Sequence, residues 1–255
     1  MRISYSSVFI LFILFILSIL LGYSTAEAQN AGAHGEATNL PQSFKELQEE
    51  GSCQGFDFSG KVVDGYLVQH GGGKIKVRIP VDYLLFPETG ITFTEKSDGM
   101  ANFNFHRDTL KPYPRREMQG KIVAGEEEWI SFLVTDFIEM KSLAKLYANL
   151  LSGRKTKSNE PPFPEKQVSA NLFQVQLPLR VQPDWEKKNL YFGRDGAAMT
   201  DVISCNVPQP NQYPHCEHLS RLGGYDVKVL YPLDQFTNWK VIKKNIQNLL
   251  ECMTD

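Results

Sequence analysis

The most constraining feature of this chain is a series of short segments in which apolar and polar residues alternate between glycine-rich turns. Strict alternation, as in Lys74 to Ile79, is typical of a strand with one face in water. Glycine tolerates the positive φ that tight hairpin turns need. Two hairpins are predicted on this basis: residues 61–69 with 74–80 across glycines 71–73, and residues 216–222 with 225–231 across Gly223 and Gly224.

Further strands are expected from less regular segments. Two of these segments flank Ser97-Asp98-Gly99, and two others flank Arg194-Asp195-Gly196, which are typical turn sequences. We expect a second hairpin from residues 91–95 and 101–106, a third strand pair from 120–124 and 128–134, and later strands at 173–181, 190–192 and 199–205.

Two segments have helical spacing of apolar residues. Asp136 is a suitable N-cap for a helix whose apolar residues run from Phe137 to Leu151, and Gly153 is a suitable residue to end it. Pro232 suits the start of a second helix, with an apolar stripe that reaches Cys252. The predicted fold class is α+β, with antiparallel β-rich sheets each followed by an amphipathic helix. Either two similar units or one domain with two sheet layers fits this order.

The N-terminus has the features of a secretory signal peptide. Arg2 precedes an apolar run from Val8 to Leu21, and Ala26-Glu27-Ala28 supplies the small residues that a signal peptidase requires. The apolar run is shorter than the roughly 20 residues needed to span a bilayer, although an uncleaved anchor is the alternative. No glycosylation sequon is present, which favours a bacterial periplasm. We expect a periplasmic protein that begins near Gln29.

Composition suggests the domain boundaries and excludes some partners. The expected parts are a signal peptide (1–28), a mobile N-terminal segment (29–58), a β-rich unit ending in a helix (59–153), a proline-containing linker or loop (154–168) and a second β-rich unit ending in a helix (169–255). The leader carries one charge of each sign, so the formal charge stays near -2 after its removal. This value argues against nucleic-acid binding and against attachment to an anionic membrane.

Four cysteines lie in the expected mature chain, and four cysteines allow three pairings. An even number in an oxidising compartment suggests disulfides. Cys205 and Cys216 flank a short proline-rich loop between two expected strands, so we favour this pair. Cys53 and Cys252 would then join the two ends of the mature chain.

The sequence contains no complete catalytic motif. His70 and the three glycines after it resemble an esterase oxyanion loop, but no Gly-x-Ser-x-Gly elbow accompanies them. His106-Arg107-Asp108 lacks the other kinase motifs, and Glu126-Glu127-Glu128 is most simply an exposed acidic turn. We expect no catalytic residues and no cofactor, although an acid–base pair can form in a fold without any local motif.

The densest group of potential metal ligands is His215-Cys216-Glu217-His218. Adjacent strand residues point to opposite faces, and this leaves Cys216 and His218 on one face. A Cys205–Cys216 disulfide would remove both thiolates, so we expect no metal. The alternative is an envelope hydrolase or metal-dependent enzyme that uses His215 and His218.

The C-terminal part resembles a known family. Cys205, the loop Tyr213-Pro214-His215-Cys216-Glu217-His218, the strand Val227 to Tyr231 and the segment around Trp239 are similar to the end of periplasmic immunity-type proteins associated with type VI secretion lipase effectors. The likeness is carried by residues 205–246. Such proteins bind and block a cognate toxic phospholipase without catalytic residues of their own. The resemblance therefore implies a toxin protein as partner.

A protein that acts by occlusion needs a surface with aromatic anchors. The candidate surfaces are residues 206–214, with Tyr213 as an anchor, and the loop 154–166, and His215 and His218 are candidate partner-binding residues beside the first of them. The leading hypothesis is a periplasmic immunity or inhibitor protein that occludes a secreted toxic enzyme. An envelope ligand-binding or assembly factor would have the same composition.

Overall fold

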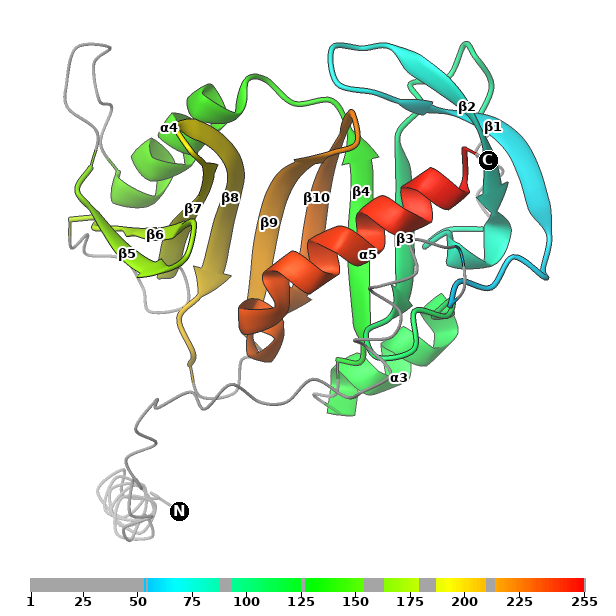
Figure 1. Cartoon of the computed structure of the whole chain (residues 1–255). Helices are drawn as coiled ribbons and strands as arrows, with labels where there is room; N and C mark the ends of the chain where they lie inside the picture. The colour runs from blue at the N-terminus through cyan, green and yellow to red at the C-terminus, as the bar shows by residue number, and fades with distance from the viewer. Residues whose placement is uncertain are drawn as a thin grey trace, which may run out of the picture. The chain divides into compact units, whose positions relative to one another are not determined.

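The computed structural model describes residues 53, 55–87, 93–124, 127–153, 163–178, 187–209 and 214–254, with only the backbone described at 119, 120 and 122–124. Its centre is an antiparallel sheet in the order β3-β4-β10-β9-β8-β7-β6-β5 (Figure 1). The strands are β3 (Ala101–His106), β4 (Trp129–Thr135), β5 (Glu165–Ser169), β6 (Leu172–Val175), β7 (Lys188–Asp195), β8 (Ala198–Asn206), β9 (His215–Leu222) and β10 (Tyr225–Pro232). The fold class is therefore α+β, as predicted.

A separate hairpin precedes the sheet. It consists of β1 (Val62–Val68) and β2 (Lys74–Pro80), which pair antiparallel across a turn in which Gly71 and Gly72 have positive φ. Leu67, Val77 and Ile79 of this hairpin are buried in the main core. Gly99 lies against it with φ +75, and a Cβ there would approach the backbone nitrogen of Val68 to 2.7 Å. This contact requires glycine at position 99.

Both predicted hairpins with glycine turns are confirmed, because β9 and β10 also pair directly across Gly223 and Gly224. The strands expected at 101–106 and 128–134 are present as β3 and β4, but the pairings expected for them are wrong. Strand β3 pairs with β4, where Phe103 stacks on Phe132, and residues 93–95 form no strand. Residues 120–124 belong to α3 (Arg115–Ala124) rather than to a strand. Short apolar runs fit either period, so the long-range partner decides between them.

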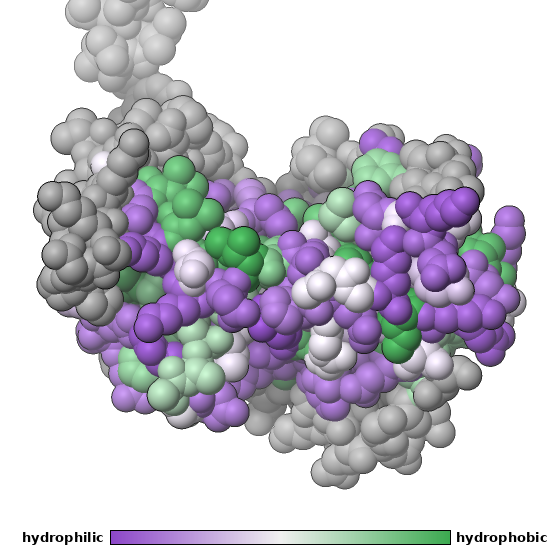
Figure 2. Space-filling model, turned by 90° about the horizontal axis from the view of Figure 1, so that it is seen from above, coloured by the Kyte–Doolittle hydropathy of each residue, from purple (hydrophilic) through white to green (hydrophobic). Residues whose placement is uncertain are grey.

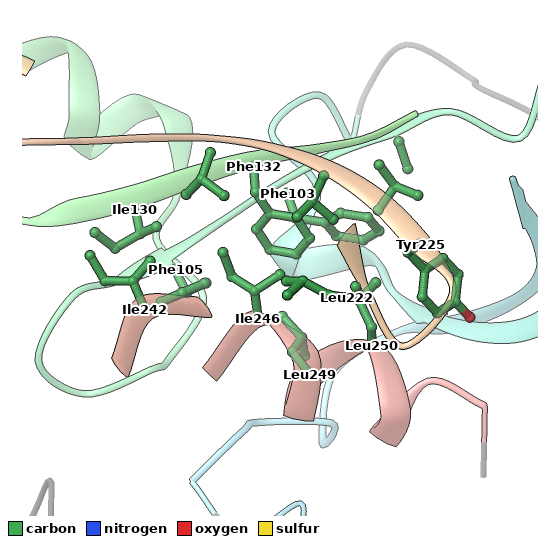
Figure 3. Packing of buried hydrophobic residues seen from close by; sticks show 14 of the residues in the cluster. Phe103, Phe105, Ile130, Phe132, Leu222, Tyr225, Ile242, Ile246, Leu249 and Leu250 are labelled. Atoms are coloured by element: carbon green, nitrogen blue, oxygen red, sulfur yellow. The ribbon is translucent and has the colours of Figure 1, made fainter. Parts of the chain in front are cut away.

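Helices cover the sheet unevenly. Helix α5 (Trp239–Cys252) follows the 3-10 helix η3 (Leu233–Asn238) and lies across one face (Figure 1). Ile242, Ile246 and Leu249 of this helix pack against the aromatic residues of β3 and β4 (Figure 3). These residues belong to the largest apolar cluster of the described residues.

On the opposite face, α4 (Met140–Ser152) covers β7 and β8. Met140, Leu143 and Ala144 pack there on Phe192 and Val202. Glu139 is the N-cap of α4, so the prediction of Asp136 as N-cap is wrong: the Asp136 carboxylate instead accepts a hydrogen bond from the Gly71 N–H. The helix ends at Gly153, where φ is +68, as predicted.

The part of the chain on each side of residues 154–168 contributes strands to the same sheet, because β4 pairs with β10. Strand β5, which lies at one edge, includes residues that the sequence placed in a linker. In the described part of the chain no helix is long and apolar enough to cross a membrane. The expected signal peptide and the expected helix at 43–50 lie outside the described residues.

Candidate functional site

Both predicted disulfides are present in the structure. Cys205 and Cys216 face each other across β8 and β9, so this bond joins two neighbouring strands. Cys53 and Cys252 link the start of the described chain to the last residue of α5. All four sulfurs are therefore in disulfides, and none of them is a thiolate that could hold a metal.

The two predicted partner-binding histidines lie on opposite faces of the sheet. His218 is on the α5 side and is completely buried, so the prediction that it contacts a partner is corrected. His215 is half-buried on the other face, near Asn206. The two imidazoles cannot serve one metal or one reaction centre. Tyr213 lies outside the described residues.

His218 belongs to a buried polar network centred on Asp201 of β8. The Asp201 Oδ1 atom lies 2.8 Å from His218 Nε2, and it accepts hydrogen bonds from the Ser220 hydroxyl and the Lys243 ammonium at 2.6 and 2.8 Å. Although aspartate, histidine and serine are the residue types of a hydrolase triad, Ser220 donates to Asp201 and not to His218. The arrangement is therefore a structural network, not an activated nucleophile.

The pKa of the Asp201 carboxyl depends on its burial and on two neighbouring basic side chains. Burial by itself raises the pKa of this carboxyl, but the hydrogen bond and charge of His218 and the ammonium of Lys243 together hold it below its usual range. Gly193 of β7 leaves room for the group, because a Cβ at this position would lie 2.7 Å from Asp201 Oδ2. The carboxylate thus joins β8, β9 and α5 in its ionised form.

A second charged cluster surrounds His70. Its Nδ1 atom lies 2.9 Å from Asp226 Oδ2 and 3.7 Å from Asp136, and Glu139 is also near. The three groups His70, Asp136 and Asp226 could by their spacing hold a cation. However, Asp226 already accepts hydrogen bonds from the Phe137 N–H and from Arg221 Nε. The cluster fastens the β1–β2 turn to the segment before α4.

The sheet face opposite α5 is left open over its central strands. Phe132 of β4 and Val229 of β10 belong to the core under α5, so their neighbours in the strands point to the opposite face. These neighbours form the floor of a hollow of about 440 Å³, called here the central hollow. Its lining includes Leu85, Asn102, Met118, Glu127, Trp129, Ser131, Leu133, His215, Lys228 and Leu230.

Helices α3 and α4 border the open part of this sheet face, and of the two only α3 contributes a residue to the described lining of the central hollow. On one side, Met118 of α3 packs with Tyr113 and Trp129. On the other, Tyr147 of α4 donates a hydrogen bond to Glu217 of β9. Seen from above, the surface on the side away from α5 is hollowed between two raised parts (Figure 2). The open strip is what remains of the sheet face between the two helices.

Exposed apolar residues occur on the floor of this strip and on α4. Leu230 on its floor is 40% exposed, and Leu146 and Leu150 of α4 are 54% and 65% exposed. Leu150 lies one turn after Tyr147, so helical spacing places it on the side of α4 from which Tyr147 reaches toward β9. Six large hydrophobic side chains are exposed among the described residues, and Leu146, Leu150 and Leu230 are three of them.

The lining of the central hollow carries few charges. Lys228 Nζ lies 2.7 Å from Glu217 Oε2, so the two neutralise each other. Glu127 is half-buried, and burial together with the negative charge of Asp234 raises the pKa of its carboxyl. Glu127 was predicted to be part of an exposed acidic turn, and the hollow was not predicted from the sequence. The sequence signal for the hollow was that β4 and β10 each carry a leucine, Leu133 and Leu230, on the face that does not pack under α5.

Comparisons with known proteins show distant likeness only. No known family and no curated protein matches the sequence. An immunity protein of the Stenotrophomonas maltophilia type IV secretion system is similar in structure, with 14% identity and a TM-score of 0.49 over 75% of this chain and 92% of that chain. The Neisseria meningitidis iron-regulated outer membrane lipoprotein FrpD has 14% identity and a TM-score of 0.41 over 77% of this chain and 93% of that chain.

Proposed function

We propose that this chain is a periplasmic immunity-type protein that binds a cognate secreted toxic enzyme, a lipase, and occludes it through the central hollow. The observation that carries the proposal is the strip of sheet left open on the face opposite α5, with Leu133 and the exposed Leu230 on its floor and Met118 of α3 in its lining. Contiguous exposed apolar surface with a polar rim is typical of a protein-binding site. The lipase class comes from the C-terminal resemblance.

The scaffold under the hollow supports binding by a rigid surface. The disulfide between β8 and β9 and the Asp201 network both restrain strands next to its floor. A surface that is ordered before binding loses little entropy on association. Disulfides form and persist mainly in oxidising compartments, which supports export.

The structure gives less support to the two alternatives. An envelope hydrolase that uses His215 and His218 would need both side chains at one centre, and they lie on opposite faces. An envelope ligand-binding factor could use the same hollow. A direct binding measurement with the toxic enzyme separates that function from inhibition of a toxin. A toxin inhibitor forms a stoichiometric complex with the enzyme and abolishes its activity.

The test is protection of cells from the toxic enzyme encoded beside this protein. The enzyme is directed to the periplasm of a host that produces wild-type protein, Leu230→Lys or the control Val168→Lys. Val168 is 44% exposed on the edge strand β5, away from the hollow, so the two positions match in exposure. We expect protection by the wild type and the control. Because Leu230→Lys places an unpaired charge in the interface, it should weaken binding about thirtyfold or more and lose protection.

Two results would contradict the proposal. Cell death in the presence of correctly exported wild-type protein would exclude inhibition of that enzyme. Full protection by Leu230→Lys, with affinity equal to that of Val168→Lys, would exclude the central hollow as the binding site.

A further inference from the structure

Glu127 occupies one end of the central hollow. It lies two residues before Trp129, the first residue of β4, and His215 at the start of β9 lines the same hollow. Trp129 pairs with His106 at the end of β3, and Leu133 pairs with Asn102 near its beginning. Glu127 therefore lies at the end of the strip opposite to Leu133 and Lys228.

The carboxylate of Glu127 has no cation partner among the described residues, whereas acidic groups close to it do. Glu128 lies 3.5 Å from Lys121 Nζ, and Asp234 lies 3.0 Å from Arg107. Glu127 is instead half-buried with a second negative charge, that of Asp234, acting on it. An ionised carboxylate in such a place is destabilised unless a cation approaches it.

The rest of the lining favours a cation over an anion. Lys228 is the only lysine or arginine among the described lining residues, and it is paired with Glu217. The unbalanced charge of the central hollow is thus negative and localised at Glu127. The floor between that charge and the opposite end is apolar, with Leu133 and Leu230 on neighbouring strands.

We propose that the central hollow receives a lysine or arginine side chain of the partner protein, with its aliphatic stem on Leu230 and its charged head at Glu127. This inference rests on the proposed function and specifies the chemistry of the partner at that site. Lysine and arginine bury their stems along apolar surface and keep their charged ends at a polar group. The basic head would supply the counter-ion that the described residues do not provide.

The first measurement is the affinity of the purified protein for the toxic enzyme encoded beside it. Glu127→Gln keeps the shape of the side chain and removes the charge, so we expect affinity to fall about ten- to a hundredfold, as for loss of a charge-assisted hydrogen bond. Glu127→Asp, which keeps the charge, should retain part of the affinity. The matched control is Glu95→Gln, an exposed glutamate outside the lining of the hollow. Affinity for Glu127→Gln equal to that of the control would overturn the inference.

The second measurement tests the site without the enzyme. Hexylguanidinium, 1-hexanol and hexyl sulfate are titrated against the protein, and the indole resonance of Trp129 is followed by NMR. We expect hexylguanidinium to bind at least tenfold more tightly than hexanol, hexyl sulfate to bind no better than hexanol, and Glu127→Gln to remove the preference. No preference in the wild type would refute a cation site even if the enzyme binds. A clear preference combined with failure to bind the enzyme would overturn the proposed function alone.

Discussion

Asp201 shows how one buried charge can hold three elements together. Its two oxygens are shared among His218 of β9, Lys243 of α5 and the hydroxyl groups of Ser220 and Thr200. A buried carboxylate is stable only when its acceptor sites are satisfied in this way. The network explains why polar residues occur on the core side of β8 and β9.

We predict that Asp201→Asn destabilises the protein by about 3–5 kcal/mol, as expected when one partner of a buried ion pair is removed. The amide cannot neutralise Lys243 or accept both of its hydrogen bonds. Urea unfolding at pH 7 measures the loss. Asp195→Asn at the exposed last residue of β7 is the control, and it should change stability by less than about 0.5 kcal/mol.

The same carboxyl should give the protein an acid-dependent stability. Its pKa in the folded protein is below the ordinary value of 3.8, so its contribution is complete above 3.8 and is lost as the pH falls through the lower folded value. Unfolding free energies measured between pH 5 and pH 2 should therefore fall less steeply for Asp201→Asn than for the wild type. Equal slopes would mean that the carboxyl titrates alike in both states.

At the scale of elements, α4 and α5 differ in how completely they are buried. Helix α5 packs its whole apolar stripe into the larger core cluster, and Ile246 and Leu249 are completely buried. Helix α4 buries Leu143 and Ala144 but leaves Leu146 exposed. Helix α4 therefore combines a structural face with exposed leucine side chains.

This difference predicts unequal effects of the same substitution. Leu249→Ala in α5 should destabilise the protein by about 2–5 kcal/mol, because it leaves a cavity under the sheet. Leu146→Ala in α4 should change stability by at most about 0.5 kcal/mol, since that side chain is 54% exposed. Chemical denaturation measures both. A large loss for Leu146→Ala would show that this leucine has a packing role that its exposure does not suggest.

At the scale of the whole molecule, the two disulfides close loops of very different length. Their sequence separations are 199 and 11 residues. In the chain-entropy account, removal of Cys53–Cys252 costs about 5 kcal/mol and removal of Cys205–Cys216 about 3 kcal/mol. Thermal unfolding of the two double Cys→Ser variants should therefore give the lower midpoint for the pair at 53 and 252. The reverse order would mean that local strand stapling outweighs loop closure.

The central hollow also belongs to this scale, because no single element forms it. It exists because α5 spans one face of an eight-stranded sheet while α3 and α4 cover only parts of the other. Glu127, Leu230 and Met118 come together there from separate segments of the chain. Sequence periodicity cannot show such a juxtaposition, since it depends on which strands become neighbours.

The sequence by itself determined the features that depend on local periodicity and turn chemistry. These are the two hairpins with glycine turns, the helix that ends at Gly153, the helix leading to Cys252 and the pairing of Cys205 with Cys216. Only the tertiary structure decided that β3 pairs with β4, that residues 115–124 are helical, that His218 is buried and that Glu127 lines a hollow. The physical reason is that a strand or a short apolar run specifies a face but not its partner. The partner is chosen by packing between residues far apart in the chain.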